Sequence, residues 1–188
     1  MRVIAGRYRS RRLQTLHGLD VRPSADRLRE TLFNVLTAGN PGVLEGTVWL
    51  DLFAGTGAVG IEALSRGAGM VYFAESSPRA AGLVLTNLQK LGVEEGFQVL
   101  QQDAVRTLPG LEKLKVLADF VFLDPPYRLS AAYEATLGAL AKSSLLKAES
   151  VVIAEHEKRF DPGEEFEALR RYRKLVQGDA ALSFYRAK

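Results

Sequence analysis

The sequence predicts an α/β domain built around a mainly parallel sheet. Apolar segments of strand length alternate along the chain with segments whose apolar residues recur at helical spacing, which is typical of βαβ units. Two of the apolar segments, 120–123 and 151–154, are continuous, as expected for strands covered on both faces. The length of 188 residues and the hydrophobic fraction of 47% suit one compact domain with a substantial core.

Two elements are predicted before this alternation begins. Residues 1–16 predict a small β-hairpin. Residues 24–37 predict a helix, because Ser24 is a good N-cap residue and apolar residues follow it at helical spacing. Glycine and proline within 39–42 then end this helix. We therefore expect a basic N-terminal arm over residues 1–22 and the main domain over residues 23–188.

Strands and helices then alternate toward the C-terminus. The predicted strands are 48–53, 70–75, 98–103, 120–123 and 151–154. Three helices are predicted in the same region. The first ends near Ser65, the second starts at Ser77-Pro78 and ends at Gly92, and the third spans 131–142. The segments 172–176 and 181–186 flank Gly178-Asp179 and predict a closing hairpin.

Positive charge is concentrated near the N-terminus. Residues 1–36 contain eight Arg and three acidic residues, whereas the remainder contains seventeen basic and nineteen acidic residues. Because a guanidinium matches phosphate oxygens well, this arm predicts a nucleic-acid partner, although a solubilising arm would have a similar composition. The predicted RNA-binding residues are Arg2, Arg7, Arg9, Arg11, Arg12 and Arg22.

Composition excludes several classes of protein. The chain has no Cys, which excludes disulfides and thiolate chemistry and permits a reducing cytosol. His17 and His156 are the two histidines, and this number argues against a His-rich metal site or a Ser-His-Asp triad. No apolar run approaches the length of a membrane span, and residues 1–7 lack the apolar region of a secretory signal. We expect a monomeric, cytoplasmic protein without a metal.

A glycine-rich turn follows the first strand. Gly55, Gly57 and Gly60 form the pattern G-x-G-x-x-G, which lets a backbone approach a ligand and also fits a dinucleotide site or a plain tight turn. Asp51 at the end of the strand suits a cationic ligand and would repel a pyrophosphate. No G-K-[ST] follows the glycines, so a P-loop is excluded.

Acidic residues end the next two strands as well. Glu75 lies 18 residues after Gly57 and is placed to accept hydrogen bonds from both hydroxyls of a ribose. Asp103 could accept a hydrogen bond from an adenine amine. Each acid alone fits a solvated strand end equally well, but acids at consecutive strand ends would converge on one crevice.

The fourth strand ends in Asp124-Pro125-Pro126-Tyr127. The prolines fix the backbone and remove N–H donors, so a carboxylate and bare carbonyls lie beside an aromatic ring. This corner predicts a site for a planar ring that carries an amino group, with Tyr127 stacked on the ring. The plainer interpretation is a turn that ends a strand beside a buried tyrosine. Guanine, with adjacent N1–H and N2–H donors, suits an acceptor carboxylate better than adenine does.

These motifs resemble those of class I S-adenosylmethionine-dependent methyltransferases that methylate exocyclic amines. The wider chain resembles the bacterial 16S rRNA guanine(966)-N2-methyltransferase family. Three segments carry this resemblance: Met1–Leu13, Arg22-Pro23-Ser24 with Arg27, Glu30, Phe33 and Asn34, and the glycine-rich segment. The resemblance implies a Rossmann-like, mostly parallel seven-stranded sheet with helices on both faces. It also implies 16S rRNA, within an assembling small ribosomal subunit, as the partner.

The resemblance further implies roles for individual residues. The cofactor-binding residues would be Asn34, Asp51, Phe53, Gly55, Gly57, Glu75, Asp103 and Ala104. The catalytic residues would be Asp124, Pro125, Pro126 and Tyr127. S-adenosylmethionine would be converted to S-adenosylhomocysteine. The chain departs from the common pattern at Phe53, where a glycine is usual, and at Asp124, where many amino-methylating relatives have Asn.

Three other interpretations remain open from the sequence. A nicotinamide-dependent oxidoreductase could use the three glycines of the turn. An adenine-N6 nucleic-acid methyltransferase shares the motif that begins at Asp124. A non-catalytic RNA-binding protein could retain the fold. For His156 a structural role is expected, because amine methylation needs no strong base there.

Overall fold

One eight-stranded sheet forms the centre of the molecule. The computed structural model describes residues 1–15, 23–126 and 128–188. The strands are β1 (Val48–Leu52), β2 (Met70–Ala74), β3 (Phe97–Leu100), β4 (Ala118–Leu123), β5 (Leu146–Glu157), β6 (Glu165–Phe166), β7 (Leu169–Gln177) and β8 (Ala180–Ala187). Their order is β3-β2-β1-β4-β5-β8-β7-β6. The first five strands pair in parallel, and β6, β7 and β8 are antiparallel, so a mainly parallel sheet is confirmed.

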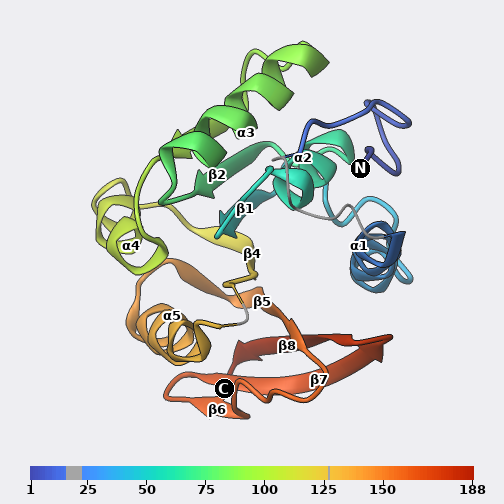
Figure 1. Ribbon diagram of the computed structural model, residues 1–188. Coiled ribbons are helices and arrows are strands. Elements are labelled where there is room, and N and C mark those ends of the chain that lie inside the picture. The colour runs from blue at the N-terminus through green and yellow to red at the C-terminus, as the bar shows by residue number, and fades with distance from the viewer. Residues whose placement is uncertain (16–22, 127) are drawn as a thin grey trace.

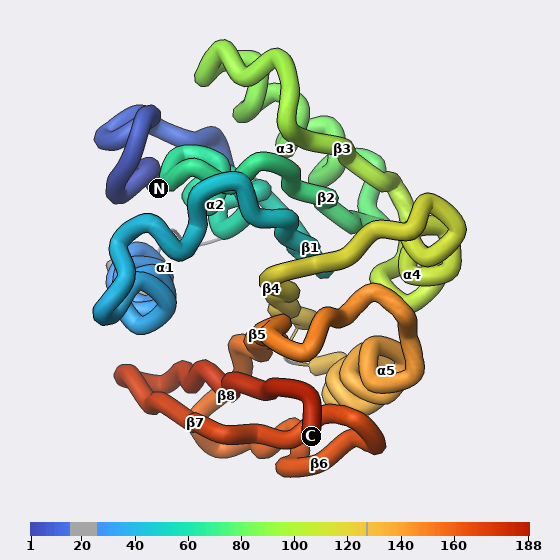
Figure 2. The backbone as a smooth tube through the Cα atoms, turned by 180° about the vertical axis from the view of Figure 1, so that it is seen from behind, coloured from blue at the N-terminus to red at the C-terminus, as the bar shows by residue number. Residues whose placement is uncertain are grey.

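In the described ranges, five helices cover the sheet. They are α1 (Pro23–Leu36), α2 (Ala58–Ser65), α3 (Pro78–Leu91), α4 (Ala104–Lys113) and α5 (Ser130–Lys142). Buried side chains of α1, α2 and α3 join one apolar cluster, and those of α4 and α5 join a second. Figures 1 and 2 show α4 and α5 on the side of the sheet opposite α1. The expected helices on both faces are therefore present. No helix in the described ranges is long and apolar enough to cross a membrane.

Two details differ from the expected fold. The sheet has eight strands instead of seven, because the two-residue β6 pairs with Leu169 and Arg170 at the edge and is too short to show periodicity. The sequence also gave no prediction for α4, which contains Pro109 in its interior. Asp103 caps this helix, and buried Leu108 and Leu111 hold it against the sheet.

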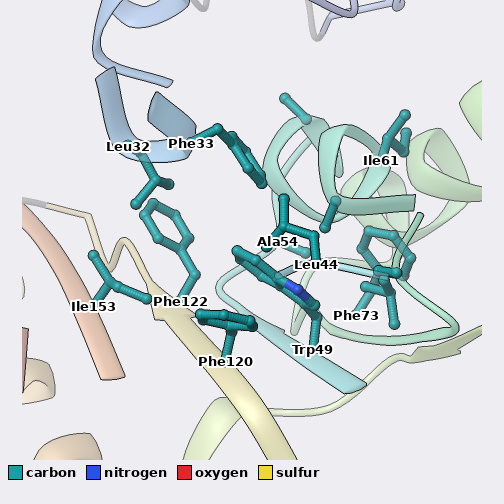
Figure 3. Close-up of a cluster of buried hydrophobic side chains, with 14 of the residues drawn as sticks. Leu32, Phe33, Leu44, Trp49, Ala54, Ile61, Phe73, Phe120, Phe122 and Ile153 are labelled. Carbon is teal, nitrogen blue, oxygen red and sulfur yellow. The ribbon is translucent and has the colours of Figure 1, made fainter. Parts of the chain in front are cut away.

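Trp49 anchors α1 to the sheet. Its ring lies between Phe33 of α1, at a centroid distance of 5.4 Å, and Phe120 of β4, at 4.9 Å (Figure 3). The Arg66 guanidinium lies 4.8 Å from the centroid of the Phe33 ring. Aromatic pairs of this kind contribute about 0.5–1.5 kcal/mol beyond the area they bury. The stack therefore fixes α1 over the strand ends that carry the polar residues described below.

The N-terminal segment forms a small hairpin that is less regular than a pair of strands. One isolated bridge, between Arg2 and Arg12, joins its two halves, and the N–H groups of Val3 and Leu13 donate to the carbonyls of Arg11 and Met1 at 3.0 and 3.2 Å. Other backbone donors of the segment bond to α2. The N–H groups of Ile4 and Ala5 donate to the Glu62 carboxylate at 2.8 and 3.0 Å, and that of Tyr8 donates to Ser65 Oγ at 2.9 Å.

Buried apolar residues of this segment belong to the core cluster that includes α1, α2 and α3. They are Val3, Tyr8 and Leu13. Figure 2 shows the segment beside α2. The division into an arm over residues 1–22 and a domain over residues 23–188 stays a prediction, but residues 1–13 pack on the same core as the sheet.

Candidate active site

The turn between β1 and α2 follows a left-handed path. Phe53, Gly55 and Gly57 have φ values of 64°, 56° and 77°. A non-glycine residue in this region costs about 1–3 kcal/mol, so the fold holds Phe53 in a strained conformation where related turns have glycine. A Cβ on Gly57 would lie 3.0 Å from Val84 Cγ1. A Cβ on Gly55 would meet only the Phe53 carbonyl, at 3.9 Å, so this face of the turn is open to a ligand.

The third glycine of the pattern has a packing role. A Cβ on Gly60 would lie 2.3 Å from Phe73 Cε1, so only glycine allows α2 to pack this closely on β2. The Gly60 N–H also donates to Asp51 Oδ2 at 2.9 Å. The end of β1 and the start of α2 are thus held together by one buried hydrogen bond.

The acids that end β2 and β3 are bound by backbone donors. Glu75 Oε2 accepts from the Gly55 N–H at 2.9 Å, and Oε1 accepts from the Ser77 N–H at 2.8 Å. Asp103 Oδ1 accepts from the N–H groups of Val105 and Arg106 at 3.0 and 3.3 Å. A carboxylate offers about four lone-pair positions, so these bonds fix both side chains and leave acceptors for a ligand.

A cavity of about 220 Å³ lies between α1, the glycine-rich turn and the ends of β1, β4 and β5. Three carboxyl groups line it, from Asp51, Asp124 and Glu155. The remaining lining residues are Met1, Leu28, Arg29, Leu32, Phe53, Ala54, Gly55, Thr56, Ala58, Val59, Phe122 and Leu182. The cavity is therefore an apolar chamber with one cation and three acids.

Burial dominates the electrostatics of these acids. Asp51 is 2% exposed, and burial raises its pKa to about 8, against the lowering effect of the Gly60 hydrogen bond. Burial raises the pKa of Asp124 to about 7. The pKa of Glu155 is also raised, by burial and by the nearby Asp124, while Arg29 acts in the opposite direction. Carboxyl groups in this state gain from a ligand that brings positive charge or hydrogen-bond donors.

The backbone of the Asp124-Pro125-Pro126 corner is fixed from the other face of the sheet. The Tyr133 hydroxyl lies 2.9 Å from the carbonyl oxygen of Glu155 and 3.4 Å from that of Pro125. Tyr133 thus joins the ends of β4 and β5. Pro125 is buried and Pro126 is exposed. The predicted stacking residue Tyr127 lies outside the described residues, as do Arg22 and His17.

The other predicted residues take different positions. Asn34 is exposed on α1 and is not among the residues that line the cavity. Ala104 is buried at the start of α4. The described RNA-binding candidates, Arg2, Arg7, Arg9, Arg11 and Arg12, are all exposed. Arg2 and Arg9 also line a second cavity of about 480 Å³ beside α1, together with Arg27 and two acids.

Two charged residues that line the cavity were not predicted. Arg29 is 5% exposed and forms ion pairs with Asp26 at 3.0 Å and with Glu62 at 3.8 Å. No sequence signal separates it from the other arginines of this region. Glu155 directly follows the apolar run 151–154, and the rule applied to the other apolar runs would have identified it, although β5 itself continues to Glu157.

His156 has the structural role that was expected. It is fully buried, with Nδ1 2.8 Å from the Glu157 carbonyl and Nε2 2.9 Å from Ser183 Oγ. A carbonyl can only accept, so Nδ1 carries the proton of the neutral ring and Nε2 accepts from Ser183. Burial lowers the pKa of this ring, which keeps it neutral. No group of three metal-ligating side chains occurs in the parts of the chain that the structure describes.

Comparison with known proteins identifies relatives over the whole chain. Ribosomal RNA small subunit methyltransferase D of Haemophilus influenzae is 36% identical over 159 residues, which cover 84% of this chain and 79% of the relative. YlbH of Bacillus subtilis is 32% identical over 188 residues, 100% of both chains. The solved structure of yhhF from Escherichia coli matches with a TM-score of 0.81 at 29% identity and covers 100% of this chain and 98% of that one.

These findings confirm the resemblance on which the expected fold was based. The architecture is that of a Rossmann-like class I methyltransferase. Residues 1–186 match the model of the family described as conserved hypothetical protein 95. The chain therefore belongs to this family, and it is a relative of ribosomal RNA small subunit methyltransferase D.

Proposed function

We propose that this protein transfers a methyl group from S-adenosylmethionine to the exocyclic N2 of a guanine in 16S rRNA. By family resemblance the target is G966. The observation that carries the proposal is the cavity in which the glycine-rich turn meets Asp51 and Asp124. The names of the relatives support the coarser assignment, an rRNA methyltransferase.

The chemistry of the cavity fits the proposed cofactor. The left-handed turn leaves open space at Gly55, and Glu75 keeps acceptors for ribose hydroxyls beside it. The buried carboxyl group of Asp51 and the half-buried one of Asp124 suit a ligand with a positive sulfur and a positive amine. A pyrophosphate would bring negative charge to the same acids, so a dinucleotide fits this cavity less well. When bound, S-adenosylmethionine supplies an electrophilic methyl group.

The residues at the end of β4 would orient and deprotonate the target amine. The N2 lone pair of guanine is delocalised into the ring, which makes the amine a poor nucleophile. Hydrogen bonds from N2–H to Asp124 and to the Pro125 carbonyl would favour a pyramidal nitrogen, on which positive charge can develop. The N–C bond would form as the bond between the methyl group and sulfur breaks, with its electron pair left on sulfur, and a proton would leave N2 for an Asp124 carboxylate oxygen. A pKa of about 7 suits this group to accept a proton near neutral pH.

The arm would bind the RNA that presents the base. A guanine within a helix cannot reach a buried cavity, so it must be unstacked at a cost of a few kcal/mol. Exposed Arg7, Arg9 and Arg12 lie on the segment that packs beside α2 and are suited to flanking phosphates. We propose a partly assembled small subunit as the substrate and a monomeric, cytoplasmic enzyme.

Methyl transfer to isolated ribosomal particles tests this function directly. Small subunits that lack their own modifications are incubated with the enzyme and radiolabelled cofactor, and the labelled nucleotide is mapped. Label on guanine N2 supports the proposal, and label on adenine N6 assigns the alternative methyltransferase. Calorimetry with S-adenosylhomocysteine and with NADH provides a second readout. Binding of NADH alone would overturn the methyltransferase assignment.

A further inference from the structure

Glu155 lies in β5, two residues before the end of that strand and beside the position of Asp124. In the parallel register of β4 and β5, Leu123 pairs with Ala154, so Asp124 and Glu155 are the next residues on adjacent strands. Neighbouring strands lie about 4.8 Å apart. Leu123 and Ala154 belong to the apolar cluster of α4 and α5. Because side chains alternate along a strand, both carboxyl groups lie on the opposite face, toward α1.

Both carboxyl groups are open to the same cavity. They line it together with Leu182, the residue of β8 that pairs with Glu155. In the described part of the chain, no N–H or O–H group donates a hydrogen bond to either side chain. This contrasts with Asp51, Glu75 and Asp103, which all accept from backbone N–H groups. Two half-buried acids without donors form a site that a ligand with two adjacent donors would complete.

Arg29 does not satisfy this requirement. Its Nη2 donates to Asp26 and to the Arg2 carbonyl, and its Nε lies 3.8 Å from Glu62. Its charge acts on Glu155 only at longer range. The acceptors of Glu155 are therefore left free by the described residues and are available to a bound molecule.

We propose that Glu155 is a specificity-determining residue that accepts a hydrogen bond from the ring N1–H of the target base, while Asp124 accepts one from the neighbouring exocyclic amine. This inference rests on the proposed function and adds the reason for the choice of base. Guanine presents the two donors side by side, whereas adenine presents a lone pair on N1 beside its amine. A carboxylate facing that lone pair would be repelled and left unpaired. Donors on the base and positive charge on the cofactor both favour the ionised form of Glu155.

The test compares guanine with 2-aminopurine at the target position of the RNA. The analogue keeps the 2-amino group but has an unprotonated N1. Small-subunit particles are reconstituted with each base, and kcat/KM for methyl transfer is measured for the wild type and for Glu155→Gln. Sites built to bind a donor reject analogues that lack it by large factors. We expect the wild type to prefer guanine by about 100-fold or more, and the variant to reduce this preference at least tenfold.

Controls separate specificity from damage to the fold. Glu157→Gln changes an exposed acid two residues along β5 and should keep the wild-type preference. Affinity for S-adenosylhomocysteine should change less than threefold in Glu155→Gln. Should Glu155→Gln unfold, Glu155→Asp keeps the carboxylate but shortens it, and it should lower guanine turnover more than 2-aminopurine turnover.

The outcomes distinguish this inference from the proposed function. Equal losses on both bases, or an unchanged preference, would overturn the role of Glu155 and leave the methyltransferase assignment intact. A wild-type enzyme that transfers no methyl group to guanine would overturn both.

Discussion

The parallel strands end at one edge of the sheet. The carboxyl groups on the β1–β3 half of this edge and those on the β4–β5 half are used in different ways. At the ends of β1, β2 and β3, Asp51, Glu75 and Asp103 are bound by backbone N–H groups, and they hold the glycine-rich turn and two helix starts in place. Asp124 at the end of β4 and Glu155 in β5 also face the cavity that Asp51 lines, but they accept no hydrogen bond from the described residues. The first half is organised before any ligand binds, whereas in our proposal the second half gains its hydrogen bonds from the target base.

Replacement of Asp124 should have the largest effect on the rate of methyl transfer. It should not alter the binding of the cofactor by the residues of the β1–β3 half. We expect Asp124→Ala to lower the rate of methyl transfer about 100- to 1,000-fold, as for other residues that stabilise charge in a transition state. Affinity for S-adenosylhomocysteine, measured by calorimetry, should stay within about threefold of the wild type. Asp179→Ala, at an exposed acid in the turn between β7 and β8, is the control. Retained turnover in Asp124→Ala would remove the assigned role.

Substitution of Glu75 should weaken cofactor binding more than it slows methyl transfer. Glu75→Gln places an amide where two backbone N–H groups are bound, and hydrogen bonds to a charged group contribute about 1.5–3 kcal/mol. We expect affinity for S-adenosylhomocysteine to fall roughly tenfold to 100-fold. The rate at saturating cofactor should fall much less. If calorimetry finds unchanged affinity, the separation of the two halves is incorrect.

Removal of positive charge from the N-terminal arm should weaken RNA binding and leave both sets of strand-end carboxyl groups unaffected. Arg7, Arg9 and Arg12 are exposed, and so is Arg11, but Arg11 also donates to the Lys90 carbonyl and helps to dock the segment. Changing Arg7, Arg9 and Arg12 to Gln should weaken RNA binding about tenfold. The slope of log K for RNA binding against log salt concentration should also decrease in magnitude by about 2, because each lost phosphate contact contributes about 0.7 to the slope. Lys113 and Lys115, exposed at the end of α4, are control positions. An unaltered salt slope would argue against the arm as the RNA site.

The smallest expected effect is a pH dependence of cofactor selectivity. With pKa values of about 7 and 8, Asp124 and Asp51 are mostly protonated at pH 6 and mostly ionised above pH 8. Ionised groups attract the positive sulfur of S-adenosylmethionine but not the neutral sulfur of its product. The ratio of the product Kd to the cofactor Kd should therefore rise several-fold from pH 6 to pH 8.5. Asp51→Asn should flatten this rise. A constant ratio in the wild type would show that these groups do not sense the sulfur.

Local signals explain why much of the fold was predictable. Continuous apolar runs identified β4 and β5, which are covered on both faces. For α3, Ser77 caps the start through its bond from the Ala80 N–H, and Gly92 ends it with a φ of 72°. Strand ends also located Asp51, Glu75 and Asp124, because a parallel sheet gathers them at one edge.

The features that were missed depend on contacts distant in sequence. The backbone of residues 4–8 bonds to Glu62 and Ser65, more than fifty positions away, and no local pattern encodes that choice. Pro109 obscured α4 because proline weakens any local helix pattern. Glu155 lies inside β5, which continues to Glu157, so no turn residue marks it as the end of a strand.

Asn87 has a consequence for how the chain is assembled. Its side chain bonds to both backbone groups of Gln14 and to the carbonyl of Thr56 in the glycine-rich turn. Gln14 lies 73 positions before Asn87, so the two can pair only after the intervening strands and helices have been synthesised. Contacts that span so many positions close late and slow the overall rate of folding. A single buried amide thus ties the turn expected to hold the methyl donor to a segment distant from it in the sequence.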